Sequence, residues 1–304
     1  MSAAKISILA DRGVVSVTGS DAGKLLQGLI TNDIEAISGF RSAIHTGLLS
    51  PQGKILFDFF AVAHDAGYLL DVPRDKASDL VKRLTMYKLR ADVSIQDVSP
   101  QFVVLALWGL HHASSGETAG TASFVDPRNG QMGLRILAES HFATDIASAT
   151  NGSNVSAEAY HAHRIALGIP EGSKDYDFGD AYPHEANFDI FNGVSFTKGC
   201  YVGQEVVARM HNKSVVKKRV VKVTGAQPLP RGADIMLGDV VIGRIGSVDG
   251  TQALALLRLD RADDALTNGQ ALSAGGADIT VDPDALTRYR TSAAARASSP
   301  GMPS

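Results

Sequence analysis

The stretch Phe196-Thr-Lys-Gly-Cys-Tyr-Val-Gly-Gln-Glu205 carries the only cysteine of the 304-residue chain. Apolar residues around and behind the cysteine recur at the spacing of one helix face, namely Val202, Val206, Val207 and Met210. This pattern predicts a glycine-containing loop that opens a helix near 201–203, and a helix that runs to about His211. Cys200 then lies at or just before the helix N-terminus, where the positive end of the helix dipole favours a thiolate.

The neighbours of Cys200 favour a functional thiol, although a lone cysteine is by default an inert core residue. Lys198 adds positive charge two positions away, which acts in the same direction as the helix dipole. Glycines on both sides let a ligand or partner approach the backbone closely. We therefore predict Cys200 and Lys198 as catalytic candidates. The supporting loop residues are Gly199, Tyr201, Gly203, Gln204 and Glu205.

Bulk properties exclude several classes of protein. The net charge is −3 with both signs mixed along the chain, so neither a nucleic-acid-binding nor a membrane-surface protein is indicated. One cysteine excludes an internal disulfide and a four-thiolate iron–sulfur site within one chain. The N-terminus lacks the long apolar run of a signal peptide, and no segment is long and apolar enough for a membrane span. We expect a soluble, cytoplasmic, monomeric protein.

The order of helical and strand patterns predicts an α+β fold. Residues 5–19 alternate around a turn and predict a β-hairpin, whereas 75–88 and 156–167 have helical spacing. Beyond 214 the chain contains only short β-like runs separated by turns, which predicts a small all-β barrel or sandwich. We expect three regions: a mixed α+β region at 1–214, a C-terminal β domain at 215–289 and a disordered Ala/Ser-rich tail at 290–304.

Three charged residues outside the cysteine stretch are candidate site residues. Asp58 interrupts the apolar run 54–60, and a buried carboxylate is costly unless partnered, so it either faces outward or belongs to a site. Glu185 lies among the aromatic residues of 182–188, where it is either a surface charge or an acceptor for a flat amino-heterocycle. Arg164 is either a ligand-binding residue or a structural ion-pair partner.

The stretch Lys198–Glu205 resembles the signature of the YgfZ-type folate-binding proteins, which are iron–sulfur cluster assembly factors. That family belongs to the aminomethyltransferase (glycine-cleavage T-protein) superfamily. The resemblance extends over most of residues 5–215. Four further stretches match the family in the expected order: Asp21–Asp33, Leu48–Asp58, Arg164–Pro170 and Pro183–Glu185.

The resemblance implies aminomethyltransferase-like folate-binding domains, with two interleaved α+β subdomains around a central funnel, followed by the C-terminal barrel. It also implies that tetrahydrofolate or a one-carbon derivative occupies the funnel. Glu185 matches the position at which the superfamily's glutamate meets the pterin ring, with Arg164 on the neighbouring helix. This chain has Phe57-Asp58 where the aminomethyltransferases carry paired aspartates, so acid–base assistance to aminomethyl transfer loses one carboxylate.

The resemblance favours a tetrahydrofolate-binding factor that assists assembly or repair of [4Fe–4S] clusters in client enzymes. Cys200 would supply one ligand to a transient cluster shared with a partner, such as an A-type iron–sulfur carrier protein, or would act by thiol exchange. One alternative is a tetrahydrofolate-dependent aminomethyltransferase or demethylase that uses Asp58. Another is a non-catalytic folate-dependent interaction module, and whether the protein is an enzyme stays open.

Overall fold

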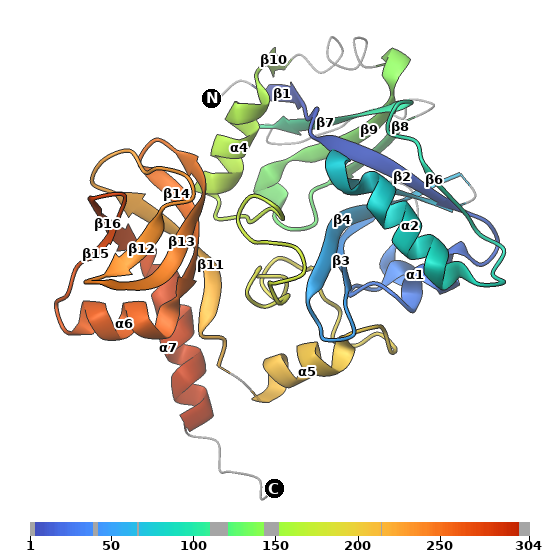
Figure 1. The fold of residues 1–304 in the computed structure, drawn as a ribbon. Coiled ribbons are helices and arrows are strands. Elements are labelled where there is room, and N and C mark those ends of the chain that lie inside the picture. Colours follow the sequence, from blue (N-terminus) through green and yellow to red (C-terminus); the bar gives the residue numbers. More distant parts are fainter. Residues whose placement is uncertain are drawn as a thin grey trace, which may run out of the picture. The chain divides into compact units, whose positions relative to one another are not determined.

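The computed structural model describes residues 4–38, 42–65, 67–109, 121–142, 152–213 and 215–297. The chain divides into two compact units (Figure 1), which are described separately. The first unit comprises Met1–Tyr160 and Phe188–Gln204. The second comprises His161–Asn187 and Glu205–Ser304.

The first unit contains a five-stranded sheet in the order β3-β4-β5-β2-β6, in which every neighbouring pair is antiparallel. Its strands are β2 (Arg12–Thr18), β3 (Ala43–Leu49), β4 (Ile55–His64), β5 (Gly67–Pro73) and β6 (Ser94–Asp97). One face is apolar and packs in a single core with helices α1 (Ala22–Gln27) and α2 (Ala77–Lys88). Successive strand residues point to opposite faces, so the other face is free to carry different chemistry.

A second sheet of the first unit has the order β10-β1-β7-β9-β8. Its strands are β1 (Lys5–Ile8), β7 (Phe102–Trp108), β8 (Thr121–Val125), β9 (Leu134–Glu139) and β10 (Ser153–Asn154). Strand β1 pairs with β7 and β10, whereas β2 pairs with β5 and β6. The hairpin predicted over 5–19 is therefore wrong, because alternation identifies a strand without specifying its partner. Short 3₁₀ turns occur at Ile34–Ala36, Arg74–Lys76, Gly130–Met132 and Ser140–Phe142.

The second unit contains a closed barrel in the order β11-β14-β13-β12-β15-β16, as predicted for the C-terminal region. Its strands are β11 (Lys218–Gly225), β12 (Asp234–Leu237), β13 (Val240–Asp249), β14 (Gln252–Arg258), β15 (Leu272–Ala274) and β16 (Ala277–Val281). Closure pairs every strand on both edges, which removes the unpaired edges of an open sheet. Helix α6 (Leu259–Thr267) contributes Leu259, Ala262 and Ala265 to the barrel core.

The C-terminal segment differs from its sequence prediction. Helix α7 (Pro283–Ala297) continues through much of the region expected to be a disordered tail from 290 onward. Arg290 on this helix pairs with Asp263 of α6, with 2.6 Å between Nε and Oδ1. Alanine has the highest helix propensity, so the Ala-rich composition that suggested disorder also suits a helix.

The predicted domain boundary near 214 lies just before β11, but the second compact unit also includes residues that precede this boundary. His161–Asn187 and the helix α5 (Gln204–Lys213), apart from its first residue, group with the barrel. Helix α4 (Ala157–Ala166) begins in the first unit and ends in the second. The chain therefore enters the second unit twice.

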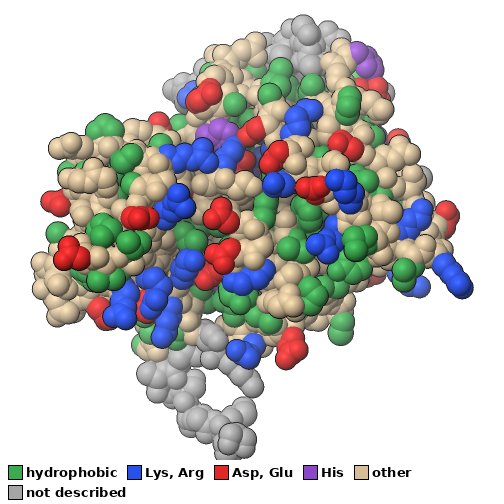
Figure 2. Space-filling model, in the orientation of Figure 1, with side chains coloured by type: hydrophobic (Ala, Val, Ile, Leu, Met, Phe, Trp, Pro, Cys, Tyr) green, Lys and Arg blue, Asp and Glu red, His purple; other side chains and the backbone are tan. Residues whose placement is uncertain are grey.

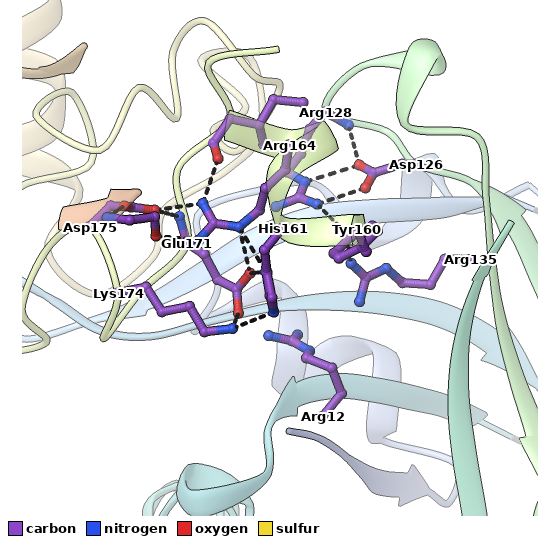
Figure 3. Close-up of polar contacts among 12 residues, drawn as sticks. Arg12, Asp126, Arg128, Arg135, Tyr160, His161, Arg164, Glu171, Lys174 and Asp175 are labelled. Atoms are coloured by element: carbon purple, nitrogen blue, oxygen red, sulfur yellow. Dashed lines mark hydrogen bonds and ion pairs between the residues drawn. The ribbon is translucent and has the colours of Figure 1, made fainter. Parts of the chain in front are cut away.

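Arg164 holds the segment 161–187 to the barrel (Figure 3). Its guanidinium is fully buried and donates to the carbonyl of Ile169 at 3.0 Å, to Asp175 at 2.7 Å and to the hydroxyl of Ser247 on β13. Asp175 in turn accepts from the backbone N–H of Ser247 at 2.8 Å. A buried arginine is tolerated because its donors are satisfied in this way.

No helix among the described ranges has both the length and the apolar character that a membrane crossing requires. On the face drawn in Figure 2, Lys and Arg side chains are interspersed with Asp and Glu. This mixing agrees with the small net charge of the sequence.

Replacing Arg164 by Met is expected to destabilise the second unit by about 3–5 kcal/mol, because it leaves the buried Asp175 carboxylate without its cation. The matched control is Arg258→Met, which removes an arginine that pairs with Asp260 at the surface; this change is expected to cost about 1 kcal/mol or less. Urea unfolding followed by circular dichroism measures both. Equal effects of the two variants would contradict the anchoring role of Arg164.

Candidate functional site

Cys200 is exposed at the apex of a loop that precedes helix α5. The helix begins at Gln204, slightly later than the start predicted near 201–203, and extends to Lys213. Gly199 is also exposed, whereas the flanking Lys198 and Tyr201 are buried in the first unit. Glu205 is exposed in the first turn of α5. The thiol is thus presented to solvent between two inward-pointing side chains.

The segment that leads to Cys200 is bound to the turn that follows α1. Six hydrogen bonds connect residues 192–198 to residues 27–32. Three of them do not involve Lys198: Ser195 N–H donates to the Thr31 carbonyl at 3.0 Å, the Thr31 hydroxyl donates to the Gly193 carbonyl at 2.6 Å, and the Asn32 amide donates to the Asn192 carbonyl at 2.7 Å. The stretches Asp21–Asp33 and Lys198–Glu205, noted separately in the sequence, therefore meet in space.

The other three hydrogen bonds come from the Lys198 ammonium. Its Nζ donates to the carbonyls of Gln27, Ile30 and Asn32, each at 2.8 Å. The Tyr201 ring lies over the ammonium, with its centroid 5.2 Å from Nζ, a cation–π geometry. Burial lowers the pKa of Lys198 to about 8. Lys198 therefore lies against the turn after α1, with these three hydrogen bonds directed to backbone oxygens.

The two glycines of the motif have different roles. Gly203 has φ of +83°, and a Cβ there would lie 2.6 Å from the Ser50 carbonyl oxygen. A side chain at this position meets both backbone strain and a clash. Gly199 has no atom within 4 Å of its ideal Cβ position. Gly203 is thus required by the packing of the loop, whereas Gly199 is not.

Asp58 lies on the sheet face opposite the helices. Its neighbours Phe57 and Phe59 belong to the core shared with α1 and α2, so Asp58 and Phe60 point to the other side. Asp58 is opposite Gly47 in the register, and in the adjacent row His45, Phe60 and Asp71 follow one another across β3, β4 and β5. Asp58 is buried. The outward-facing alternative for Asp58 is therefore wrong.

This second face carries buried charges that the sequence reasoning missed. Asp71 accepts from Arg12 Nε at 2.6 Å and from Arg135 of β9 at 2.7 Å. The Arg135 guanidinium carbon lies 4.5 Å from the Phe60 ring centroid. Asp71 and Arg135 interrupt apolar strands just as Asp58 does, so the same signal was available for both.

A second ion pair, Arg128 with Asp126, lies beside this face (Figure 3). It is bidentate, with 3.0 Å from Nε to Oδ1 and 2.7 Å from the second nitrogen to Oδ2. The hydroxyl of Tyr160 accepts from both Arg128 and Arg135. Together with Asp71 and Asp58, these groups make this side of strands β3–β5 polar, with Arg128 and Arg135 both lying over the Phe60 ring.

His45 is the group on this face whose hydrogen bonding is incomplete. It is 6% exposed, and its Nδ1 has no hydrogen-bond partner among the residues that the structure describes. Burial, and next to it the charge of Arg128, lowers its pKa to about 3, against a backbone hydrogen bond to Phe191 that raises it. His45 is therefore a neutral imidazole with one acceptor nitrogen directed to no donor. Asp58 and His45 are both acceptors, on adjacent rows of one face.

Glu185 and Arg164 lie in the second unit. One Glu185 carboxylate oxygen accepts from the Tyr182 N–H at 2.9 Å, which leaves acceptor capacity on the other oxygen. Arg164 donates hydrogen bonds to Ile169, Asp175 and Ser247. Its Nε also lies 3.2 Å from the Glu171 carboxylate. Of the two roles left open by the sequence, this geometry favours the structural ion pair for Arg164. Within the described ranges, no cluster of three or more His, Cys, Asp or Glu residues is arranged to hold a metal ion.

The fold is that of an aminomethyltransferase-like protein with a C-terminal barrel. It is similar to the glycine cleavage system aminomethyltransferase T from Bartonella henselae, with a TM-score of 0.74, 15% identity, and coverage of 92% of this chain and 85% of that one. Residues 217–288 match the family model described as CAF17, C-terminal beta-barrel domain. The predicted fold class is confirmed.

The chain belongs to the IBA57 family. It is 33% identical over 271 residues to human "Iron-sulfur cluster assembly factor IBA57, mitochondrial", covering 81% of this chain and 75% of the human protein. It is 35% identical over 232 residues to the IBA57 homolog of Mycosarcoma maydis, covering 72% of this chain but only 57% of that longer protein. The narrower resemblance to YgfZ-type proteins stays a prediction.

These relatives correct the expected location. The human, mouse and Mycosarcoma maydis proteins are all named as mitochondrial. The names point to a mitochondrial rather than a cytoplasmic protein, so the expectation of a cytoplasmic protein is wrong. That expectation relied on composition and on the absence of a targeting pattern, and both are indirect indicators of location.

His45 is expected to make stability depend on pH. In the unfolded chain the imidazole gains a proton as pH falls below about 6.5, whereas in the folded protein it stays neutral until about pH 3. Its contribution to stability is therefore complete above about pH 6.5 and is lost progressively as pH falls. Melting of the first unit, followed by the single buried Trp108, should lose less stability on acidification in His45→Gln than in wild type. Identical pH dependence would contradict the assignment.

Gly203→Ala is expected to cost about 1–3 kcal/mol, because it combines a positive φ with a clash against Ser50. Gly199→Ala is the matched control, four residues away in the same loop, and should be close to neutral. Urea unfolding followed by Trp108 fluorescence compares them. A neutral Gly203→Ala would show that the loop is not packed as described.

Proposed function

We propose that this protein is an iron–sulfur cluster assembly factor in which Cys200 is the functional thiol and a tetrahydrofolate-type molecule is the bound ligand. Membership of the IBA57 family supports the assembly role, because the named relatives are iron–sulfur cluster assembly factors. The observation that carries the proposal is the exposure of Cys200 on a loop whose base is fixed by six hydrogen bonds.

The cluster is the cargo. A [4Fe–4S] cluster is held by four cysteine thiolates, and this chain contributes one cysteine. Cys200 would therefore supply one ligand at an interface with a carrier protein or a [4Fe–4S] client enzyme, which would supply the others. The loop base holds the thiol outward, where a second protein can reach it. Thiol exchange with a partner is the other route open to an exposed cysteine.

The residues suited to a folate are acceptors. Only one of the two Glu185 carboxylate oxygens accepts the Tyr182 N–H. A carboxylate binds the paired N–H donors of an amino-heterocycle well. A separate candidate position, within the first unit alone, is given by Asp58 and by the Nδ1 of His45, for which the described residues supply no hydrogen-bond partner. When bound, tetrahydrofolate would carry a one-carbon group, and residues of this chain would bind and orient it.

The second candidate is a tetrahydrofolate-dependent aminomethyltransferase or demethylase, and the buried position of Asp58 on the polar face favours it. The position of Phe57 weighs against it. Phe57 lies in the core packed on α1 and α2, so the residue that replaces one aspartate of the superfamily pair points away from Asp58. The candidate requires turnover of a folate adduct that depends on Asp58 and survives loss of Cys200.

The decisive test is complementation of cells that lack this protein, with the activity of [4Fe–4S] enzymes as the readout. Wild type should restore activity and Cys200→Ser should not, although both should melt at similar temperatures because Cys200 is exposed. Thr197→Ala, an exposed change in the same loop, is the matched control and should restore activity. Equal rescue by Cys200→Ser would refute the thiol and direct attention to Asp58. A large loss of melting temperature would instead mean that the cysteine is structural.

Folate binding is tested separately by calorimetry with tetrahydrofolate. Glu185→Gln keeps an oxygen that can accept from Tyr182, so the loop should stay folded. Its affinity is expected to fall about 10-fold or more, because a hydrogen bond to a charged group contributes about 1.5–3 kcal/mol. Unchanged affinity would exclude Glu185 from the binding site, and no binding by wild type would exclude the ligand.

A further inference from the structure

Lys198 has a complete set of hydrogen-bond partners. An ammonium group has three N–H donors and no acceptor. The carbonyls of Gln27, Ile30 and Asn32 each lie 2.8 Å from Nζ, so they take all three donors. No N–H is left to donate to the sulfur of Cys200. The sequence suggested that Lys198 acts on the thiol. These hydrogen bonds instead connect Lys198 to backbone carbonyls of residues 27–32.

The carbonyls that Lys198 binds need hydrogen-bond donors, and a cation is a favourable donor at this place. Gln27 is the last residue of α1, and the final carbonyls of a helix have no partner within it. The negative end of the helix dipole also lies there. Ile30 and Asn32 belong to the turn that follows, where their carbonyls point to the same ammonium. Lys198 thus closes the end of α1 from a position 171 residues further along the chain.

Cys200 is held from both sides. Lys198 precedes it by two residues and is 8% exposed, and Tyr201 follows it and is 7% exposed. The Tyr201 ring covers the Lys198 ammonium at 5.2 Å, so the two side chains contact each other beneath the apex. Burial raises the pKa of Tyr201 to about 12, which keeps its ring a neutral phenol. Gly199 and Cys200 are the exposed residues between these two anchors.

We propose that Lys198 is a positioning residue: it fixes the Cys200 apex to the end of α1 and does not act as the acid–base partner of the thiol. This inference rests on the proposed function of Cys200. Substitution of Lys198 should therefore release the loop and impair delivery of the thiol to a partner, while the intrinsic titration of the thiol stays the same.

The test combines three measurements on Lys198→Met, with Lys198→Arg as the variant that keeps the charge. The alkylation rate of Cys200 by iodoacetamide as a function of pH should keep its midpoint. Amide hydrogen exchange at Gly193, Ser195 and Lys198, whose N–H groups donate hydrogen bonds at the loop base, should accelerate about 10-fold or more, which corresponds to the loss of at least one hydrogen bond to a charged group. Rescue of [4Fe–4S] enzyme activity should fall toward that of Cys200→Ser, and Lys198→Arg should recover part of the protection and of the rescue.

Two results would overturn the proposal. A rise of the alkylation midpoint by about one pH unit or more in Lys198→Met would show that the ammonium stabilises the thiolate. Unchanged hydrogen exchange would show that Lys198 does not hold the loop. If Cys200→Ser also rescues activity, the proposed function fails, yet the exchange measurement still decides whether Lys198 positions the loop.

If Lys198→Met does not fold, Lys198→Arg provides the test alone. Its guanidinium keeps the charge but not the three N–H donors on one nitrogen. Exchange at 193–198 should therefore accelerate relative to the strands of the same unit, while the alkylation midpoint stays the same. Equal exchange in wild type and Lys198→Arg would contradict the anchoring by Lys198.

Discussion

The hydrogen bonds between the Lys198 ammonium and three backbone carbonyls are the interaction on which the cysteine loop depends. They join the end of α1 to a segment more than 160 residues further along the chain. Ser195, Gly193 and Asn192 add their own contacts to the same turn. A buried cation is stable only where it meets such partners. The loop therefore has a fixed base beneath an exposed thiol.

The polar face of the first unit's five-stranded sheet follows a related rule. Asp71 is bound by Arg12 and Arg135, and Asp126 by Arg128, so these buried charges are paired. His45 differs from these residues, because it stays neutral and has an acceptor nitrogen for which the described residues supply no donor. Natural cores seldom leave a buried polar atom unsatisfied. The polar face therefore carries both paired charges and, in His45, an acceptor whose hydrogen bonding is incomplete among the described residues.

Local patterns in the sequence predicted much of the architecture. Helical spacing located α2 and α4, and the short runs beyond 214 predicted the barrel. An isolated charge in an apolar strand identified Asp58 and, applied more widely, would have identified Asp71 and Arg135. The hairpin prediction was wrong because β1 and β2 both alternate apolar and polar residues but pair with different strands. The disordered tail failed because an Ala-rich composition suits a helix as well as a flexible chain.

Long-range partners are what the sequence could not supply. Nothing around Lys198 indicates that its donors reach Gln27 and Asn32, and its two-residue spacing from Cys200 suggested thiol chemistry instead. The same is true of Arg164, because its hydrogen bond to Ser247 joins residues that are 83 positions apart in the sequence. In both cases a charged side chain near a motif donates its hydrogen bonds to partners that are distant in the sequence.

The proposed role of the exposed thiol can be measured directly on unmutated protein, because the chain has a single cysteine. Cys200 is alkylated with iodoacetamide, and the blocked and untreated proteins are added to an extract that lacks the protein, with recovery of [4Fe–4S] enzyme activity as the readout. We expect recovery with the untreated protein and none with the blocked protein, with the same circular dichroism for both. Equal recovery would contradict it.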